Sequence, residues 1–267
     1  MTASHEARPV PVVMRVVMPA VMRSVMPGVR RLLRCLVWPV IVAVPAAVPA
    51  ALAGQASAVD AGSFTIVHGT AKIGREEFTI RRAPDPDNGY ILSGTAVYAD
   101  RRLTPTLATD SAGAPLRYQV EVRSAERRQE LLTLQIVRGH ASQRTQTAHG
   151  ESATEFRVAD GARLLDDDVY NQYYLIARGV ISGRTPTPGL SETVRTVVPH
   201  RSSESLERIT VVGDDSVMVG GHLLDATRLR LTAPSGDRDI WADALGRILK
   251  VAIPARDLVA TRDDAPQ

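Results

Sequence analysis

The segment LLDDDVYNQYYLIARG, residues 164–179, decides the fold, because it leaves the alternating pattern that fills most of the chain. It predicts a helix over residues 166–178, with an Asp at the N-cap and acidic residues in the first turn. Arg178 occupies the last turn and Gly179 the C′ position. Apolar side chains surround most of this helix, so we expect it to be nearly enclosed, and only a sheet is available to enclose it.

Short alternating segments on both sides of the helix predict β-strands. The clearest is Leu116–Arg123, in which apolar and polar residues alternate strictly, as in a strand with one buried face. Turn residues such as Asp85–Gly89 separate the strands. Similar runs occupy residues 78–82, 90–98, 131–137, 193–198, 206–212, 227–232 and 249–253.

These runs predict a mainly β fold. We expect roughly ten to twelve strands, about seven or eight before the helix and four or five after it. They would form a strongly curved antiparallel sheet, a half-barrel or a barrel, around one central helix near residues 166–178. Residues 142–147 are polar on both faces but rich in Thr, and we interpret them as an edge strand or a strand that lines a wet concavity.

The first 58 residues have the features of an export signal. Arg30, Arg31 and Arg34 precede an uncharged run, Cys35–Ala53, and a short tail then ends in small residues that suit cleavage after Ala58. An Arg- and Pro-bearing repeat extends the region upstream of the run. We therefore expect a signal peptide at 1–58 and a single β-rich domain at 59–267, in the periplasm or outside the cell.

The alternative for the leader is a retained membrane anchor. The apolar run is just long enough to cross a bilayer, but Pro39, Pro45 and Pro49 interrupt it, and its alanine-rich half inserts weakly. We therefore favour cleavage, and expect no stable transmembrane span in the mature chain.

The leader also accounts for the basic charge. It holds six Arg and one Glu, which gives it a net charge of +5. Since the whole chain carries +3, the mature chain carries −2. The mature chain therefore lacks the excess of positive charge that nucleic-acid binding requires. Cys35 is the single cysteine, so we expect no disulfide and no thiolate metal site after cleavage.

No catalytic motif appears in the sequence. The mature histidines are scattered, and a surface-loop position is the simpler interpretation for each. Asp166-Asp167-Asp168 has the chemistry of a hard-cation site, but a capped helix start accounts for it better. We expect no catalytic residues, no metal and no cofactor.

The tyrosines of the helix are the strongest candidates for a ligand site. Core packing is one interpretation of these residues. The other is that the helix forms one wall of a cavity in which phenols and amides orient a ligand. Trp241 lies in a short strand-like run and has the same two interpretations. The candidate ligand-lining residues are Tyr170, Asn171, Tyr173, Tyr174 and Trp241.

Three stretches carry a resemblance to known proteins. The first is Gly69–Phe78, where a strand turns at Gly into a second strand. The second is the central helix at residues 165–175. The third is Asp239–Trp241 followed by Gly246–Pro254, which looks like a final hairpin. The chain thereby resembles uncharacterised exported bacterial proteins related in shape to the periplasmic lipoprotein-carrier (LolA/LolB-like) half-barrels. The resemblance implies a curved sheet around a helix and the non-catalytic handling of an apolar or lipid-like molecule in the envelope.

Three hypotheses for the function follow. The first is an envelope protein that binds or carries a lipid or other amphiphile. The second is a structural or interaction protein whose helix is fully packed, without a cavity. The third, which is the weakest, is a hydrolase of an envelope polymer that uses dispersed carboxylates or histidines. The sequence leaves the ligand and the oligomeric state open.

Overall fold

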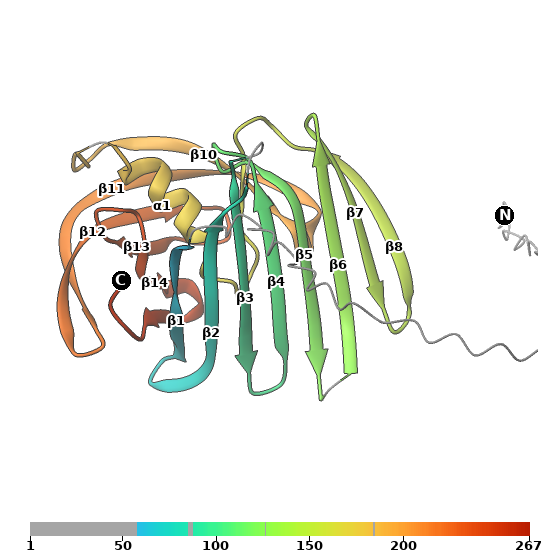
Figure 1. The fold of residues 1–267 in the computed structure, drawn as a ribbon, viewed down its shortest axis with the longest axis horizontal. Coiled ribbons are helices and arrows are strands. Elements are labelled where there is room, and N and C mark those ends of the chain that lie inside the picture. Colours follow the sequence, from blue (N-terminus) through green and yellow to red (C-terminus); the bar gives the residue numbers. More distant parts are fainter. Residues whose placement is uncertain (1–57, 85–87, 126, 184) are drawn as a thin grey trace, which may run out of the picture. The chain divides into compact units, whose positions relative to one another are not determined.

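The computed structural model describes residues 58–84, 88–125, 127–183 and 185–267. Residues 1–57 of the proposed leader, with Cys35 among them, lie outside the described residues. Everything below concerns the described part of the chain, drawn in colour in Figure 1.

The described residues form one curved antiparallel sheet with a single α-helix, which confirms the predicted fold class. The sheet has more strands than expected, 15 within the described residues, nine before the helix and six after it. Several of the additional strands are short or polar, so their sequences do not alternate clearly. The strands are β1 (Ala58–His68), β2 (Ala71–Arg82), β3 (Tyr90–Tyr98), β4 (Arg102–Thr109), β5 (Pro115–Ser124), β6 (Arg127–Val137), β7 (His140–Thr147), β8 (Gly150–Arg157), β9 (Arg163–Leu164), β10 (Ser191–Val198), β11 (Ser203–Val219), β12 (His222–Thr232), β13 (Arg238–Ala242), β14 (Ile248–Ile253) and β15 (Leu258–Arg262).

The strand order is β8-β7-β6-β5-β4-β3-β2-β1-β15-β14-β13-β12-β11-β10-β9. Each strand from β1 to β7 pairs antiparallel with its successor in sequence, and so does each from β10 to β14. The sheet therefore consists of two meanders, and the short strand β9 adds to β10 in parallel. The two meanders join where the first strand pairs with the last, from Phe64 opposite Arg262 to His68 opposite Leu258. We call this junction the β1–β15 seam.

Alternation explains why these residues form strands. In β4, Leu103, Pro105 and Leu107 are buried while the residues between them are more exposed, as period-two geometry requires. The run 142–147, expected at an edge, belongs to β7, which is paired on both sides by β6 and β8. The edge strand next to β7 is β8, whose side chains are almost all exposed.

The helix α1 spans Tyr173–Ile181, later in the chain than the predicted 166–178. Its N-cap is Gln172 rather than an Asp, because Asp168 has a positive φ of 63° that interrupts helical geometry. Gly179 lies inside the helix, and the glycine with left-handed geometry after the helix is Gly183, at φ 74°.

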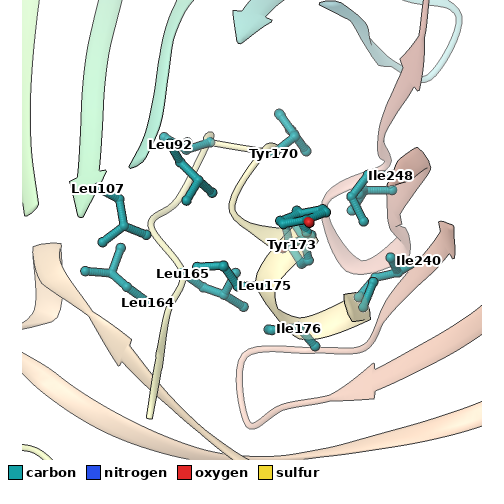
Figure 2. Packing of buried hydrophobic residues seen from close by; sticks show 14 of the residues in the cluster. Leu92, Leu107, Leu164, Leu165, Tyr170, Tyr173, Leu175, Ile176, Ile240 and Ile248 are labelled. Atoms are coloured by element: carbon teal, nitrogen blue, oxygen red, sulfur yellow. The ribbon is translucent and has the colours of Figure 1, made fainter. Parts of the chain in front are cut away.

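The helix is enclosed, as expected: seven of its nine residues are buried. In Figure 2, Ile240 and Ile248 from β13 and β14 lie on one side of Tyr173, and Leu92 and Leu107 from β3 and β4 lie beyond the opposite side. The turn after β13 also touches the helix, since a Cβ on Gly246 would lie 2.7 Å from Arg178 Cα. Both meanders therefore contribute side chains to the same core.

Candidate functional site

All five candidate ligand-lining residues are buried. Tyr170, Asn171 and Tyr174 are at most 2% exposed, Tyr173 is 5% exposed and Trp241 is 8% exposed. The first four lie together in and just before α1. Burial raises the pKa of the Tyr170 hydroxyl to about 12, with the Asp168 charge adding to the effect, so this phenol is neutral.

Trp241 lies apart from the tyrosines. Its neighbours in β13, Ile240 and Ala242, belong to the main core, whereas Trp241 belongs to a smaller cluster with Val217 and Leu249. Because successive strand residues point to opposite faces, Trp241 is on the face of the sheet away from the helix. There its indole Nε1 donates to Asp215 Oδ2 at 2.7 Å.

A buried glutamate holds the chain just before the helix. Glu76 of β2 is fully buried and accepts hydrogen bonds from the backbone N–H groups of Tyr170 (2.6 Å) and Asn171 (3.0 Å). Burial raises the pKa of Glu76 to about 7, and these two N–H groups limit the rise. The carboxylate thus holds the turn that precedes α1, whereas no side chain caps the helix itself at Gln172.

Asp166 is the centre of a second buried network. Its carboxylate accepts from the Tyr118 hydroxyl and pairs with His200 Nδ1, each at 2.5 Å. His200 Nε2 forms an ion pair with Glu130 at 3.2 Å. The hydrogen bond to Asp166 raises the pKa of His200 to about 9, against the effect of burial and with help from the charges of Asp166 and Glu130.

This network resembles the acid–histidine pairs of hydrolases, but its protonation state suits a different role. At neutral pH the imidazole of His200 carries two protons and has no lone pair with which to act as a base. Glu130 belongs to β6, His200 to the short 3₁₀-helix η1 (Pro199–Arg201), and Asp166 to the segment before α1. The network therefore connects the first meander to the segments on either side of the helix.

The space beside the helix tyrosines is nearly filled. A slit lined by Tyr170, Tyr173, Glu207 and Arg238 encloses only about 20 Å³, which is room for about one water molecule. An acyl chain does not fit there. The cavity that the helix tyrosines were expected to line is therefore not present beside Tyr170 and Tyr173.

A much larger depression lies where three turns meet. We call it the turn groove; it has a volume of about 710 Å³. It is bordered by the β1–β2 turn, the β3–β4 turn and the 3₁₀-helix η2 (Pro254–Arg256). Tyr98, Ile73 and Leu258 provide apolar surface, and Arg101, Arg256 and Asp168 provide charge.

Asp168 joins the β3–β4 turn to η2. Its carboxylate accepts from Arg101 Nη2 and from Arg256 Nη2, each at 2.7 Å, and its backbone oxygen accepts from the Tyr98 hydroxyl at 3.1 Å. Asp168 has a positive φ, which is an unfavourable backbone conformation for a residue other than glycine, and these contacts hold it in place. The Asp triplet therefore forms tertiary contacts and does not begin the helix.

Within the described residues, no group of three or more His, Cys, Asp or Glu side chains is arranged to hold a metal ion. No helix in that part of the chain is long and apolar enough to cross a bilayer. Ala58, the predicted cleavage position, is the first residue of β1 and lies opposite Arg81 of β2.

One solved structure supports the fold. No family model matches the sequence, and no curated protein matches it. The structure is similar to a β-barrel-like protein of the domain of unknown function DUF1849 from Brucella abortus, with a TM-score of 0.51 and 8% identity over 77% of this chain and 94% of that one. A DUF1089 protein from Pseudomonas aeruginosa gives a TM-score of 0.39 at 13% identity, over 84% and 97% of the two chains. At this identity the likeness to the Brucella protein concerns the fold alone.

Several residues of the site escaped the sequence analysis, although one had a signal. Glu76 precedes Phe78 and Ile80 at intervals of two, so it falls on the buried face of its strand, where an unpaired charge is costly. His200, Arg101 and Arg256 lie in turns, where no period indicates direction. Their convergence on Asp166 and Asp168 depends on tertiary structure.

Proposed function

We propose that this chain is an exported, non-catalytic binding protein of the cell envelope, and that it takes an amphiphile in the turn groove rather than inside the sheet. The observation that carries the proposal is the difference between the two spaces. The slit beside Tyr173 has about 20 Å³, whereas the turn groove has about 710 Å³. Sites for small ligands commonly have volumes of about 300–1,000 Å³.

The lining of the turn groove suits an amphiphile. Tyr98, Ile73 and Leu258 come from β3, β2 and β15, so the apolar surface belongs to regular strands rather than to loops. Arg101 and Arg256 flank it and are partly exposed, at 38% and 43% of their side chains. A molecule with a charged head and a short apolar part would contact both kinds of surface.

The resemblance to lipoprotein-carrier half-barrels supports the ligand class but not its location. A carrier of that kind would enclose an acyl chain between the sheet and the helix. Here Tyr173 and its neighbours fill the space beside the helix tyrosines. The proposal therefore keeps the amphiphile and moves it to the surface.

Binding of a short-chain amphiphile by the full chain, followed by calorimetry or by NMR, tests the location. Ala99 is an exposed residue that lines the turn groove, and Ala99→Trp should fill the groove and abolish most of the binding. The matched control is Ala153→Trp at an exposed position of β8, which should bind like the wild type. Binding that survives Ala99→Trp would refute the proposed site.

Export can be tested separately. Proteolytic removal of the leader after Ala58 would give a chain that begins at Val59, and N-terminal sequencing of the protein from the envelope fraction should find this residue. An intact leader on protein recovered from the cytoplasm would count against export.

The second candidate is a structural or interaction protein without a ligand. The filled core favours it, because an enclosed helix needs no function beyond packing. Under this hypothesis neither the wild type nor Ala99→Trp binds an amphiphile in the assays above.

A further inference from the structure

The charged side chains of the turn groove differ in how far they are exposed to solvent. Its lining includes two guanidinium groups, Arg101 and Arg256, and three carboxylates, Asp100, Asp168 and Asp257. Asp168 lies between the two arginines with only 12% of its side chain exposed, whereas the Asp100 side chain is 73% exposed. The positive charge is therefore centred on the Arg–Asp168–Arg cluster, and additional negative charge lies nearer to solvent.

The arginine pair retains unused donors. Within the described residues Arg256 donates a hydrogen bond only from Nη2, so its Nε and Nη1 remain available. Arg101 donates from Nη2 to Asp168 and from Nη1, at 3.5 Å, to the exposed Asp100, so its Nε remains available. One carboxylate between two guanidinium groups leaves one net positive charge, and guanidinium donors pair best with a carboxylate or phosphate oxyanion.

Backbone hydrogen bonds hold the turns that carry the two exposed carboxylates, Asp100 and Asp257. Asp257 follows η2 with a positive φ of 49°, and its backbone oxygen accepts from the Gly69 N–H of the β1–β2 turn at 3.0 Å. Asp100 belongs to the β3–β4 turn, where the Tyr98 N–H donates to the Arg101 oxygen at 2.8 Å. These bonds hold the turns that carry both carboxylates.

The five charged groups together carry a net charge of −1. A purely anionic ligand would be repelled by Asp100 and Asp257, and a purely cationic ligand would be repelled by Arg101 and Arg256. We infer that the turn groove binds a zwitterionic amphiphile, with an oxyanion at Arg101 and Arg256, an ammonium group at Asp100 and Asp257, and apolar atoms against Tyr98, Ile73 and Leu258. This inference rests on the proposed function and specifies the class of its ligand.

The test compares three short-chain amphiphiles of equal acyl length, all below their micelle concentrations, with the full chain in a calorimeter. The head groups are phosphoethanolamine, which is zwitterionic, phosphoglycerol, which is anionic, and trimethylammonium, which is cationic. The zwitterion should bind about tenfold more tightly than either of the others, as expected for one additional charge-assisted contact.

Two sets of variants test the two charged parts. Arg256→Gln should weaken binding of the zwitterion about tenfold, while Arg208→Gln, at an exposed position of β11, should leave it unchanged. Asp100→Asn with Asp257→Asn should remove the preference for the zwitterion over the anion. These two aspartates are exposed, so the double variant is expected to fold.

The outcomes separate the inference from the proposed function. Equal affinity for the three head groups, with loss of binding in Ala99→Trp, would overturn the zwitterion and leave the groove as a binding site. The same loss in Arg208→Gln as in Arg256→Gln would also overturn the inference. No binding of any of the three would remove both.

Discussion

Arg262 in the last strand donates two parallel hydrogen bonds to Asp60 in the first strand, from Nη1 at 2.9 Å and from Nη2 at 2.8 Å. Both side chains are almost completely buried, at 1% and 2% exposure. The guanidinium also lies over the Phe78 ring, 5.3 Å from its centroid. This buried pair crosses the β1–β15 seam, which joins the two meanders.

Removing the cation of this pair should be costly. Arg262→Met leaves the Asp60 carboxylate buried without its partner, and we expect the free energy of unfolding to fall by about 3–5 kcal/mol, measured by urea denaturation. The double variant Asp60→Leu with Arg262→Met should recover much of the loss. As a control, Arg144→Ala breaks an exposed pair with Glu151 and should cost less than about 1 kcal/mol. A small effect of Arg262→Met would show that the seam does not depend on the pair.

His200 should make stability depend on alkaline pH. The pKa of His200 is about 9 in the folded chain, above its ordinary value of 6.5, so its stabilising contribution is fully present below about pH 6.5 and is lost as the pH rises through 9. The difference in unfolding free energy between wild type and His200→Gln should therefore shrink over this range. A difference that stays constant from pH 6 to about pH 10 would contradict the ion pairs with Asp166 and Glu130.

Glu76 should act in a lower window. Because the pKa of Glu76 rises from 4.5 to about 7 on folding, its contribution is present below about pH 4.5 and is lost as the pH rises through 7. The stability of wild type relative to Glu76→Gln should decrease between these values, as measured by chemical denaturation at several pH values. An increase over the same range would mean that the folded state favours the charged form of Glu76.

Tyr173 tests whether the interior is filled. Tyr173→Ala should reduce the free energy of unfolding by about 3–5 kcal/mol, because it deletes a ring from a packed site. Tyr173→Phe keeps the ring and should cost less than about 1 kcal/mol. If the alanine variant matched the wild type in a urea titration, the space beside α1 would be loosely packed and the case against an interior ligand would weaken.

The sheet could be predicted from the sequence because alternation is a local signal. The run at 90–98 has the bounds of β3, and Leu116–Arg123 lies within β5. The position of the helix was less accessible. Asp166, Asp167 and Asp168 have the composition of a helix start, but partners distant in sequence, Tyr118, His200, Arg101 and Arg256, hold Asp166 and Asp168 in another conformation.

The candidate site shows the same division between local and distant signals. The aromatic segment at 170–174 was correctly predicted to be enclosed, but whether an enclosed tyrosine lines a cavity depends on how closely its neighbours approach. The turn groove comes from three turns that are distant in sequence. Charged turn residues have no period, so nothing in the sequence indicated that Arg101 and Arg256 share one carboxylate.

The seam between β1 and β15 has a consequence for the order of folding. Residues 64–68 find their partner strand only among residues 258–262, so the centre of the sheet cannot close until almost the whole chain is available. Contacts that are so distant in sequence slow folding. If the chain is exported as proposed, such a delay would help it to cross the membrane in extended form, since β1 stays unpaired on one side until residues 258–262 are available.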